Sequence, residues 1–177
     1  MNIPERSEEE WSAIGKRLGK KMAEFVGDYL QYRIMEDKVL QQTAIENYRE
    51  EVERATQAGL ECPQAWFILA TAIEEPDERL RALFRVLQSL EAEFEITPPR
   101  QPSEWWDQTQ VYAETYYELG RMHARASRSG AARDSFERAL SFANSLRALR
   151  PLITGPSPDY EDKLEGKIAA ASLMLDD

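Results

Sequence analysis

The feature that most constrains the fold is a repeated helical pattern between residues 116 and 143. Apolar, aromatic or small side chains recur every three or four residues in two successive segments, as on the buried faces of helices. These positions are Tyr116, Leu119, Gly120 and His123 in the first segment, and Ala132, Phe136 and Ala139 in the second. Small residues at Gly120 and Ala132 allow two helices to approach closely, and Phe136 fills the space between them. The stretch therefore predicts a tightly packed helix–turn–helix unit.

A weaker copy of this pattern lies upstream. It consists of Trp66, Leu69, Ala70 and Ile73, followed at the same offsets by Ala82 and Val86. Both copies resemble the tetratricopeptide repeat (TPR), a helix–turn–helix unit of about 34 residues with the pattern W-x2-L-G-x2-Y…A-x3-F. The resemblance covers residues 63–94 and 113–146. Trp66 and Tyr116 are separated by more than one repeat length, which indicates an irregular array.

The rest of the chain is also predicted to be helical, because no stretch alternates polar and apolar residues with period two. At 177 residues the chain is long enough for one domain with a real core. We expect an all-α, TPR-like stack of antiparallel helix pairs, about seven helices in a single domain over residues 1–177. Its predicted parts are an N-terminal helix pair (1–60), a degenerate repeat (63–94), the best-matching repeat with an extended first helix (103–149), and a C-terminal capping helix (158–175).

Local signals predict where the helices begin and end. Ser7 and Glu10 form a capping box at the start of a helix that runs to about residue 35. Further helices are predicted over residues 37–58, 63–75, 77–94, 103–128 and 130–149, with Asp77 and Ser103 as caps. The buried stripe of the helix from Ser103 is predicted to contain Trp105, Thr109, Tyr112, Tyr116, Leu119 and His123.

Charge is unevenly distributed along the chain. Thirty-two acidic and 22 basic residues give a net charge of −10, which argues against general nucleic-acid binding. Residues 37–96 hold 13 acidic and 6 basic residues, whereas residues 121–150 hold seven arginines and two acidic residues. This pattern favours charge-selected protein partners, basic ones in particular, with a simply solvated surface as the alternative.

Few residues offer catalytic or metal-binding chemistry. Cys62 is the only cysteine, and a helix start lowers a thiol pKa, but no adjacent histidine is available to pair with it. His123 stands where the repeat has a core aromatic residue, so we expect it to be packed. The acidic turn at residues 74–78 lacks the glycine and the spaced oxygen ligands of a calcium loop. We expect no enzymatic activity, no metal and no cofactor.

The sequence also predicts a cytoplasmic protein that does not enter a membrane. Its first residues, MNIPERSEEEW, lack the apolar core of a signal peptide. The longest uncharged run, residues 62–73, is much shorter than the roughly 20 residues of a membrane-spanning helix.

The TPR resemblance implies a groove lined by the first helix of each repeat. At 100° per residue, the groove residues fall on an arc beside the core residues of each helix. On the helix from Pro63 they are Gln64, Phe67, Thr71 and Glu74; on the helix from Ser103 they are Trp106, Gln110, Tyr117, Arg121 and Arg125. Two alternatives are that the N-terminal helix or the loop around Pro98 fills this groove.

TPR modules bind peptides or protein surfaces, so the resemblance implies a non-enzymatic protein-binding module. A small acidic adaptor, a chaperone and an immunity-type inhibitor all fit this expectation. The alternative is a structural subunit that assembles with itself through Trp105, Trp106 and the C-terminal helix, as a homo-oligomer.

Overall fold

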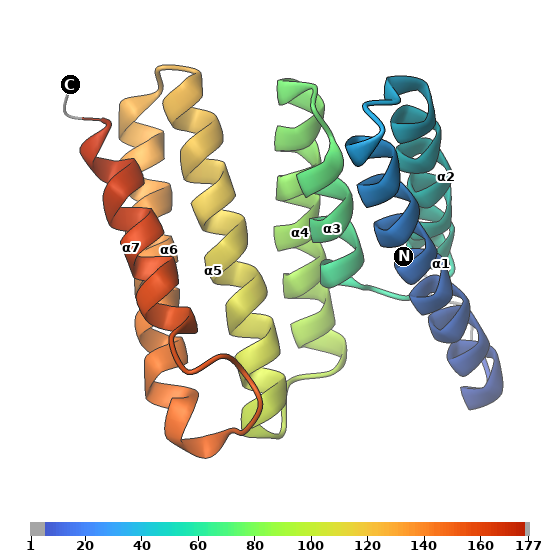
Figure 1. The fold of residues 1–177 in the computed structure, drawn as a ribbon. Helices are drawn as coiled ribbons and strands as arrows, with labels where there is room; N and C mark the ends of the chain where they lie inside the picture. Colours follow the sequence, from blue (N-terminus) through green and yellow to red (C-terminus); the bar gives the residue numbers. More distant parts are fainter. Residues whose placement is uncertain (1–5, 176–177) are drawn as a thin grey trace.

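A computed structural model describes residues 6–175, and it is all-helical (Figure 1). Helices make up 82% of it, and no strand occurs among the described residues. The helices are α1 (Glu8–Ile34), α2 (Lys38–Gln57), α3 (Pro63–Ala72), α4 (Pro76–Ile96), α5 (Pro102–Arg125), α6 (Ser129–Leu149), the short 3₁₀ helix η1 (Arg150–Leu152), and α7 (Tyr160–Leu173). The predicted all-α stack is confirmed. Residues 1–5 and 176–177 lie outside the described residues. Residues 1–5 belong to the N-terminal segment predicted to lack the apolar core of a signal peptide.

The helices form successive antiparallel pairs, α1–α2, α3–α4 and α5–α6, with α7 added at the end. In Figure 1, α1, α3 and α7 lie in front of α2, α4 and α6. Among the described residues, none of the helices has the length and apolar character needed to cross a membrane.

The ends of the first pair are set by side-chain caps. The predicted capping box is present: the amide of Glu10 donates to Oγ of Ser7 at 3.2 Å, and the amide of Ser7 donates to the Glu10 carboxylate at 2.8 Å. Asp37 caps α2 by accepting a hydrogen bond from a backbone amide of its first turn at 3.0 Å. The two helices pack through their apolar stripes, and the Phe25 and Tyr48 rings stack with centroids 4.5 Å apart.

The turn between α3 and α4 differs from the prediction. Helix α3 ends at Ala72, earlier than the predicted residue 75, and Pro76 is the first residue of α4. The cap is Glu75 and not Asp77, because the Glu75 carboxylate accepts hydrogen bonds from the backbone amides of Asp77 (3.2 Å) and Glu78 (2.6 Å). A proline at the first helical position has no amide to satisfy, so the residue before it is placed to reach the free amides that follow.

Helix α5 also begins and ends earlier than predicted. Pro102 is its first residue, Gln101 stands in the cap position predicted for Ser103, and the helix ends at Arg125 and not at residue 128. The Glu104 carboxylate accepts hydrogen bonds from the backbone amides of Arg100 and Gln101, at 2.7 and 3.3 Å. These bonds fix the entry of the chain into α5 after the proline-rich loop.

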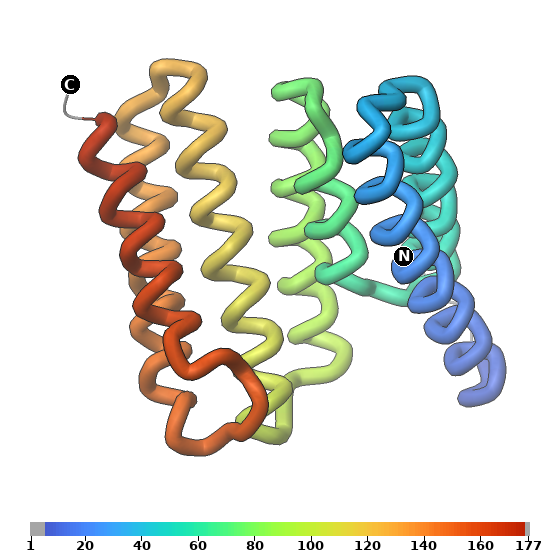
Figure 2. The backbone as a smooth tube through the Cα atoms, in the orientation of Figure 1, coloured from blue at the N-terminus to red at the C-terminus, as the bar shows by residue number. Residues whose placement is uncertain are grey.

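Helix α5 joins two apolar clusters. The first is built mainly from α1 to α4 and takes Val111, Leu119 and Met122 from α5. The second is built from α5, α6 and α7 and takes Trp106 and Ala113. In Figure 2, α5 runs between the α3–α4 pair and the α6–α7 side of the molecule. Because α5 is covered from two directions, a single buried stripe does not describe it.

The predicted stripe of α5 is accordingly wrong at its two ends. Trp105 is 41% exposed, and Trp106 is buried in its place. His123 is only half-buried, whereas the neighbouring Met122 belongs to the core.

Candidate functional site

A depression of about 260 Å³ opens between α3, α5 and α7. Large side chains from all three helices line it: Phe67 from α3, Tyr117 from α5, and Tyr160 and Leu164 from α7. The Phe67, Tyr117 and Tyr160 side chains are half-buried, so each keeps part of its ring accessible. Neither α1 nor the loop around Pro98 contributes a lining residue. The depression is therefore an accessible surface to which three helices contribute aromatic rings, beside charged side chains.

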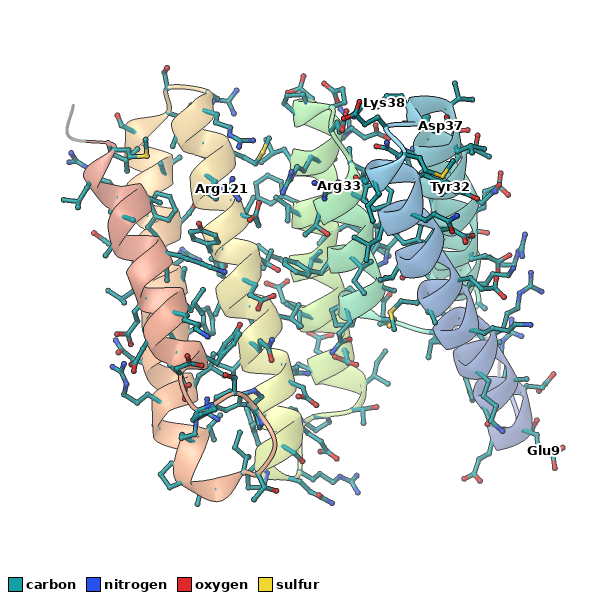
Figure 3. All side chains as sticks on the ribbon, viewed as in Figure 1. Glu9, Tyr32, Arg33, Asp37, Lys38 and Arg121 are labelled. Carbon is teal, nitrogen blue, oxygen red and sulfur yellow. The ribbon has the colours of Figure 1, made fainter. Side chains whose placement is uncertain are left out.

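Tyr117 is held in place by its neighbours on α5 and α6. Its ring lies 6.2 Å from the ring of Phe136, centroid to centroid. The guanidinium of Arg121 lies 5.7 Å from the Tyr117 centroid, in cation–π contact. Figure 3 labels Arg121 on α5. One side of the tyrosine is thus fixed against the protein while the other borders the depression.

Two glutamates of α5 line the depression, but both have partners within the chain. Glu114 accepts hydrogen bonds from the Tyr160 hydroxyl and, at 3.3 Å, from Nε2 of Gln110. Burial raises the pKa of Tyr160, and the adjacent Glu114 carboxylate raises it further, so the phenol stays protonated and acts as the donor. This bond ties the start of α7 to the middle of α5.

Glu118, which lines the depression, joins two helix pairs. Its carboxylate accepts from Arg79 of α4 at 2.6 Å and from Arg121 of α5 at 2.9 Å. Arg79 and Glu118 keep only 18% and 12% of their side-chain surface exposed, so the pair is poorly screened by solvent. Glu118 is therefore neutralised by two arginines, whereas the partners of Glu114, a hydroxyl and an amide, are uncharged.

Two lysines of α7 also line the depression. Lys163 and Lys167 lie one helical turn apart and are both exposed. Lys163 pairs with Asp159 at 2.7 Å. The lining thus combines three aromatic rings with charged groups of both signs.

Only part of the predicted groove comes together in the structure. Phe67 and Tyr117 line the same depression, and Gln110 touches it through its bond to Glu114. The prediction for Trp106 is wrong: it is only 2% exposed, with the guanidinium of Arg150 4.5 Å from its ring centroid and the Tyr160 ring at 6.2 Å. The segment leading into α7 covers this tryptophan.

The remaining predicted residues lie elsewhere on the surface. Gln64 lines a separate depression with Glu93 and the Pro98 loop. Thr71 is exposed, and its hydroxyl donates to the backbone carbonyl of Ile68 at 2.8 Å. Glu74 pairs with Lys38 of α2 at 2.5 Å. Arg125 is exposed at the last residue of α5. None of these four lines the depression around Tyr117.

Several lining residues are not predicted from the sequence. The two lysines and Tyr160 belong to α7, whose pattern is that of a capping helix. The i, i+4 spacing of Tyr160 with Leu164, and of Lys163 with Lys167, indicates that the members of each pair share one side of the helix. The sequence does not say which helix α7 contacts. Glu114 resembles any exposed helix acid until its bond to Tyr160 is known.

The two residues with catalytic potential, Cys62 and His123, lie outside this depression. Burial raises the pKa of the Cys62 thiol, and Glu93 and Glu61 raise it further, so the expected effect of a helix start does not dominate. Burial, together with Arg128, lowers the pKa of His123. No group of three histidine, cysteine, aspartate or glutamate side chains in the described part of the chain has a metal-binding arrangement.

Comparisons of this chain with protein-family models, with curated protein sequences and with solved structures find no match.

Proposed function

We propose that this chain is a non-enzymatic protein-binding module that takes a segment of a partner protein into the depression between α3, α5 and α7. The observation that carries the proposal is the convergence of Phe67, Tyr117 and Tyr160 from three different helices on one accessible surface. Aromatic residues are enriched among the residues that dominate binding energy at protein interfaces. Their partial burial also fixes them before binding, which reduces the entropy lost on association.

The TPR-like pattern supports the same location. In TPR proteins the first helices of successive repeats line the binding groove, and α3 and α5 are the first helices of their pairs. An adaptor, a chaperone and an immunity-type inhibitor would all use such a surface, in a cytoplasmic setting. A catalytic role has less support, because Cys62 and His123 do not line the depression.

Self-assembly is the second candidate, but not by the predicted route. Trp106 is buried under Arg150 and cannot contribute to an interface between copies. The observation that favours self-association is a line of exposed apolar side chains on α1, formed by Val26, Leu30 and Ile34.

Selection from a random peptide library tests the proposed site, because it requires no candidate partner. We expect wild-type protein to enrich peptides that share an apolar anchor, and these peptides to bind poorly to the Phe67→Ala/Tyr117→Ala variant. Val39→Asn is a matched control, because Val39 is exposed on α2, away from the depression. Enriched peptides that bind wild type and the Phe67→Ala/Tyr117→Ala variant equally would place the binding site elsewhere.

A further inference from the structure

Helix α1 has apolar residues on two faces, and only one face is covered. The covered face packs in the core through Ile14, Leu18, Met22, Phe25 and Tyr29. On the other face, Val26, Leu30 and Ile34 leave 38%, 51% and 84% of their surface exposed. At about 100° per residue these three lie roughly 80–160° around the helix from Leu18. A line of large apolar side chains therefore faces solvent along the C-terminal half of α1.

The N-terminal half of the same face is made mostly of small residues, with Lys16 at its edge. Ser12, Gly15, Gly19 and Ala23 continue the line toward the start of the helix. A Cβ added at Gly15, Gly19 or Gly27 would meet no heavy atom within 4 Å, so no packing inside the chain requires these glycines. Each glycine inside a helix costs about 0.5–1 kcal/mol relative to alanine. A close approach from outside the chain would account for this cost.

We propose that this face binds α1 of a second copy of the chain, in an antiparallel and two-fold symmetric pair. If two copies of α1 cross where Gly19 meets Ala23 of the second copy, the large half of each face lies on the small half of the other. Leu30 then lies over Ser12, and Val26 packs beside Gly15. The contact is self-complementary, as a two-fold interface requires. Glycine at the crossing lets the two backbones come close.

Charges at the two ends of α1 favour the same arrangement. Glu8 and Glu9 lie in the first turn and Arg33 in the last turn, all on or beside this face. Figure 3 labels Glu9 and Arg33 near opposite ends of the helix. Glu8 and Arg33 lie on the same flank of this face, so antiparallel pairing brings Glu8 of each copy near Arg33 of the other, whereas parallel pairing would bring like charges together. Shape and charge therefore select the antiparallel orientation.

The face is accessible for such a contact. In Figure 1 the N-terminal half of α1 extends beyond the end of α3, away from the other helix pairs. The interface is separate from the depression around Tyr117, whose lining includes no residue of α1. Each copy in the dimer thus keeps its own depression, so the dimer rests on the self-assembly candidate and does not depend on the binding site proposed between α3, α5 and α7.

Sedimentation velocity of the full chain between about 1 and 100 μM tests the proposal. We expect wild type to dimerise to twice 20.4 kDa. Gly19→Leu fills the crossing and should weaken dimerisation at least about tenfold, while leucine keeps or raises helix content. Val39→Asn is the matched control, since Val39 is 75% exposed on α2 but lies off this face, and it should leave the dimer unchanged. Phe67→Ala/Tyr117→Ala should also leave the dimer unchanged.

A charge exchange tests the orientation. Arg33→Glu alone and Glu8→Arg alone should each weaken the dimer, and the variant with both changes should recover it. A wild-type chain that stays monomeric at 100 μM overturns the proposal, even if another protein proves to cover α1. A dimer that tolerates Gly19→Leu overturns it too, because that dimer uses another surface. A charge-exchanged variant that dimerises no better than the single variants overturns the antiparallel pairing.

Discussion

Gly120 of α5 lies so close to Phe136 of α6 that a Cβ at position 120 would be 2.4 Å from Cε1 and 2.5 Å from Cδ1 of the phenylalanine ring. Phe136 is buried and belongs to the cluster formed by α5, α6 and α7, so its ring has little room to shift. The same ring lies beside Tyr117. The distance between the two helices therefore also sets the position of one wall of the depression.

Gly120→Leu should destabilise the fold by about 1–3 kcal/mol or more, because the added side chain overpacks the crossing. Urea unfolding measures this change, with Gly166→Ala on α7 as the control. A Cβ at Gly166 meets no heavy atom within 4 Å, so that variant should be as stable as wild type or up to about 1 kcal/mol more stable. A Gly120→Leu variant as stable as wild type would mean that the helices do not cross at this position.

Arg150 should contribute more to the stability of the packed α7 than any other single residue. Its guanidinium donates to the buried carboxylate of Glu161, at 2.8 Å from Nε, and to the backbone carbonyls of Pro156 and Ser157 at 3.1 and 2.8 Å. Arg150→Met leaves the buried Glu161 carboxylate without its hydrogen-bonded guanidinium and should cost about 3 kcal/mol in urea unfolding.

Arg147→Met is the matched control for that experiment. Arg147 pairs with Asp162 at 2.7 Å and Glu165 at 2.8 Å but keeps half of its side chain exposed. Its loss should cost about 1 kcal/mol or less, because solvent screens exposed ion pairs. Equal costs for the two variants would show that Arg150 does not anchor α7.

Glu93→Gln should stabilise the protein at pH 7. Burial raises the pKa of Glu93, with a further contribution from Glu61, and the bond from Gln108 offsets only part of it. A raised pKa in the folded state means that folding is less favourable while the group is ionised, and that wild type gains stability as pH falls through that pKa. The advantage of the variant should therefore shrink between pH 7 and about pH 4.

Thermal melts of wild type and Glu93→Gln at several pH values measure the difference in stability between them. Glu95→Gln, at an exposed position, is the control. Carboxylates that both proteins share titrate equally and cancel in the comparison. A stabilisation by Glu93→Gln that grows as pH falls would contradict the raised pKa.

The first helix pair is predicted well because its signals are local. The capping box at Ser7 is read within one turn, and α1 and α2 agree closely with the predicted ranges 7–35 and 37–58. Trp105 and Trp106 show where local reading fails. Adjacent residues differ by about 100° on a helix, and either tryptophan fits a plausible stripe. Arg150 and Tyr160, which cover Trp106, lie more than 40 positions further along the chain.

The candidate site, like α5, is only partly predictable from the sequence. Phe67 and Tyr117 follow from the repeat pattern, which fixes their phase relative to the core. Lys163, Lys167 and Tyr160 join them only because α7 packs beside α5, and the sequence of an amphipathic helix does not specify its neighbour. The missing information is tertiary contact, not helix propensity.

Isothermal titration calorimetry with a library-selected peptide tests the proposed function most directly. Phe67→Ala/Tyr117→Ala should bind at least about 30-fold more weakly than wild type, equivalent to about 2 kcal/mol, while its circular-dichroism spectrum stays helical. Equal affinity in wild type and variant, or a variant that loses binding only because it has unfolded, would contradict a binding site between α3, α5 and α7.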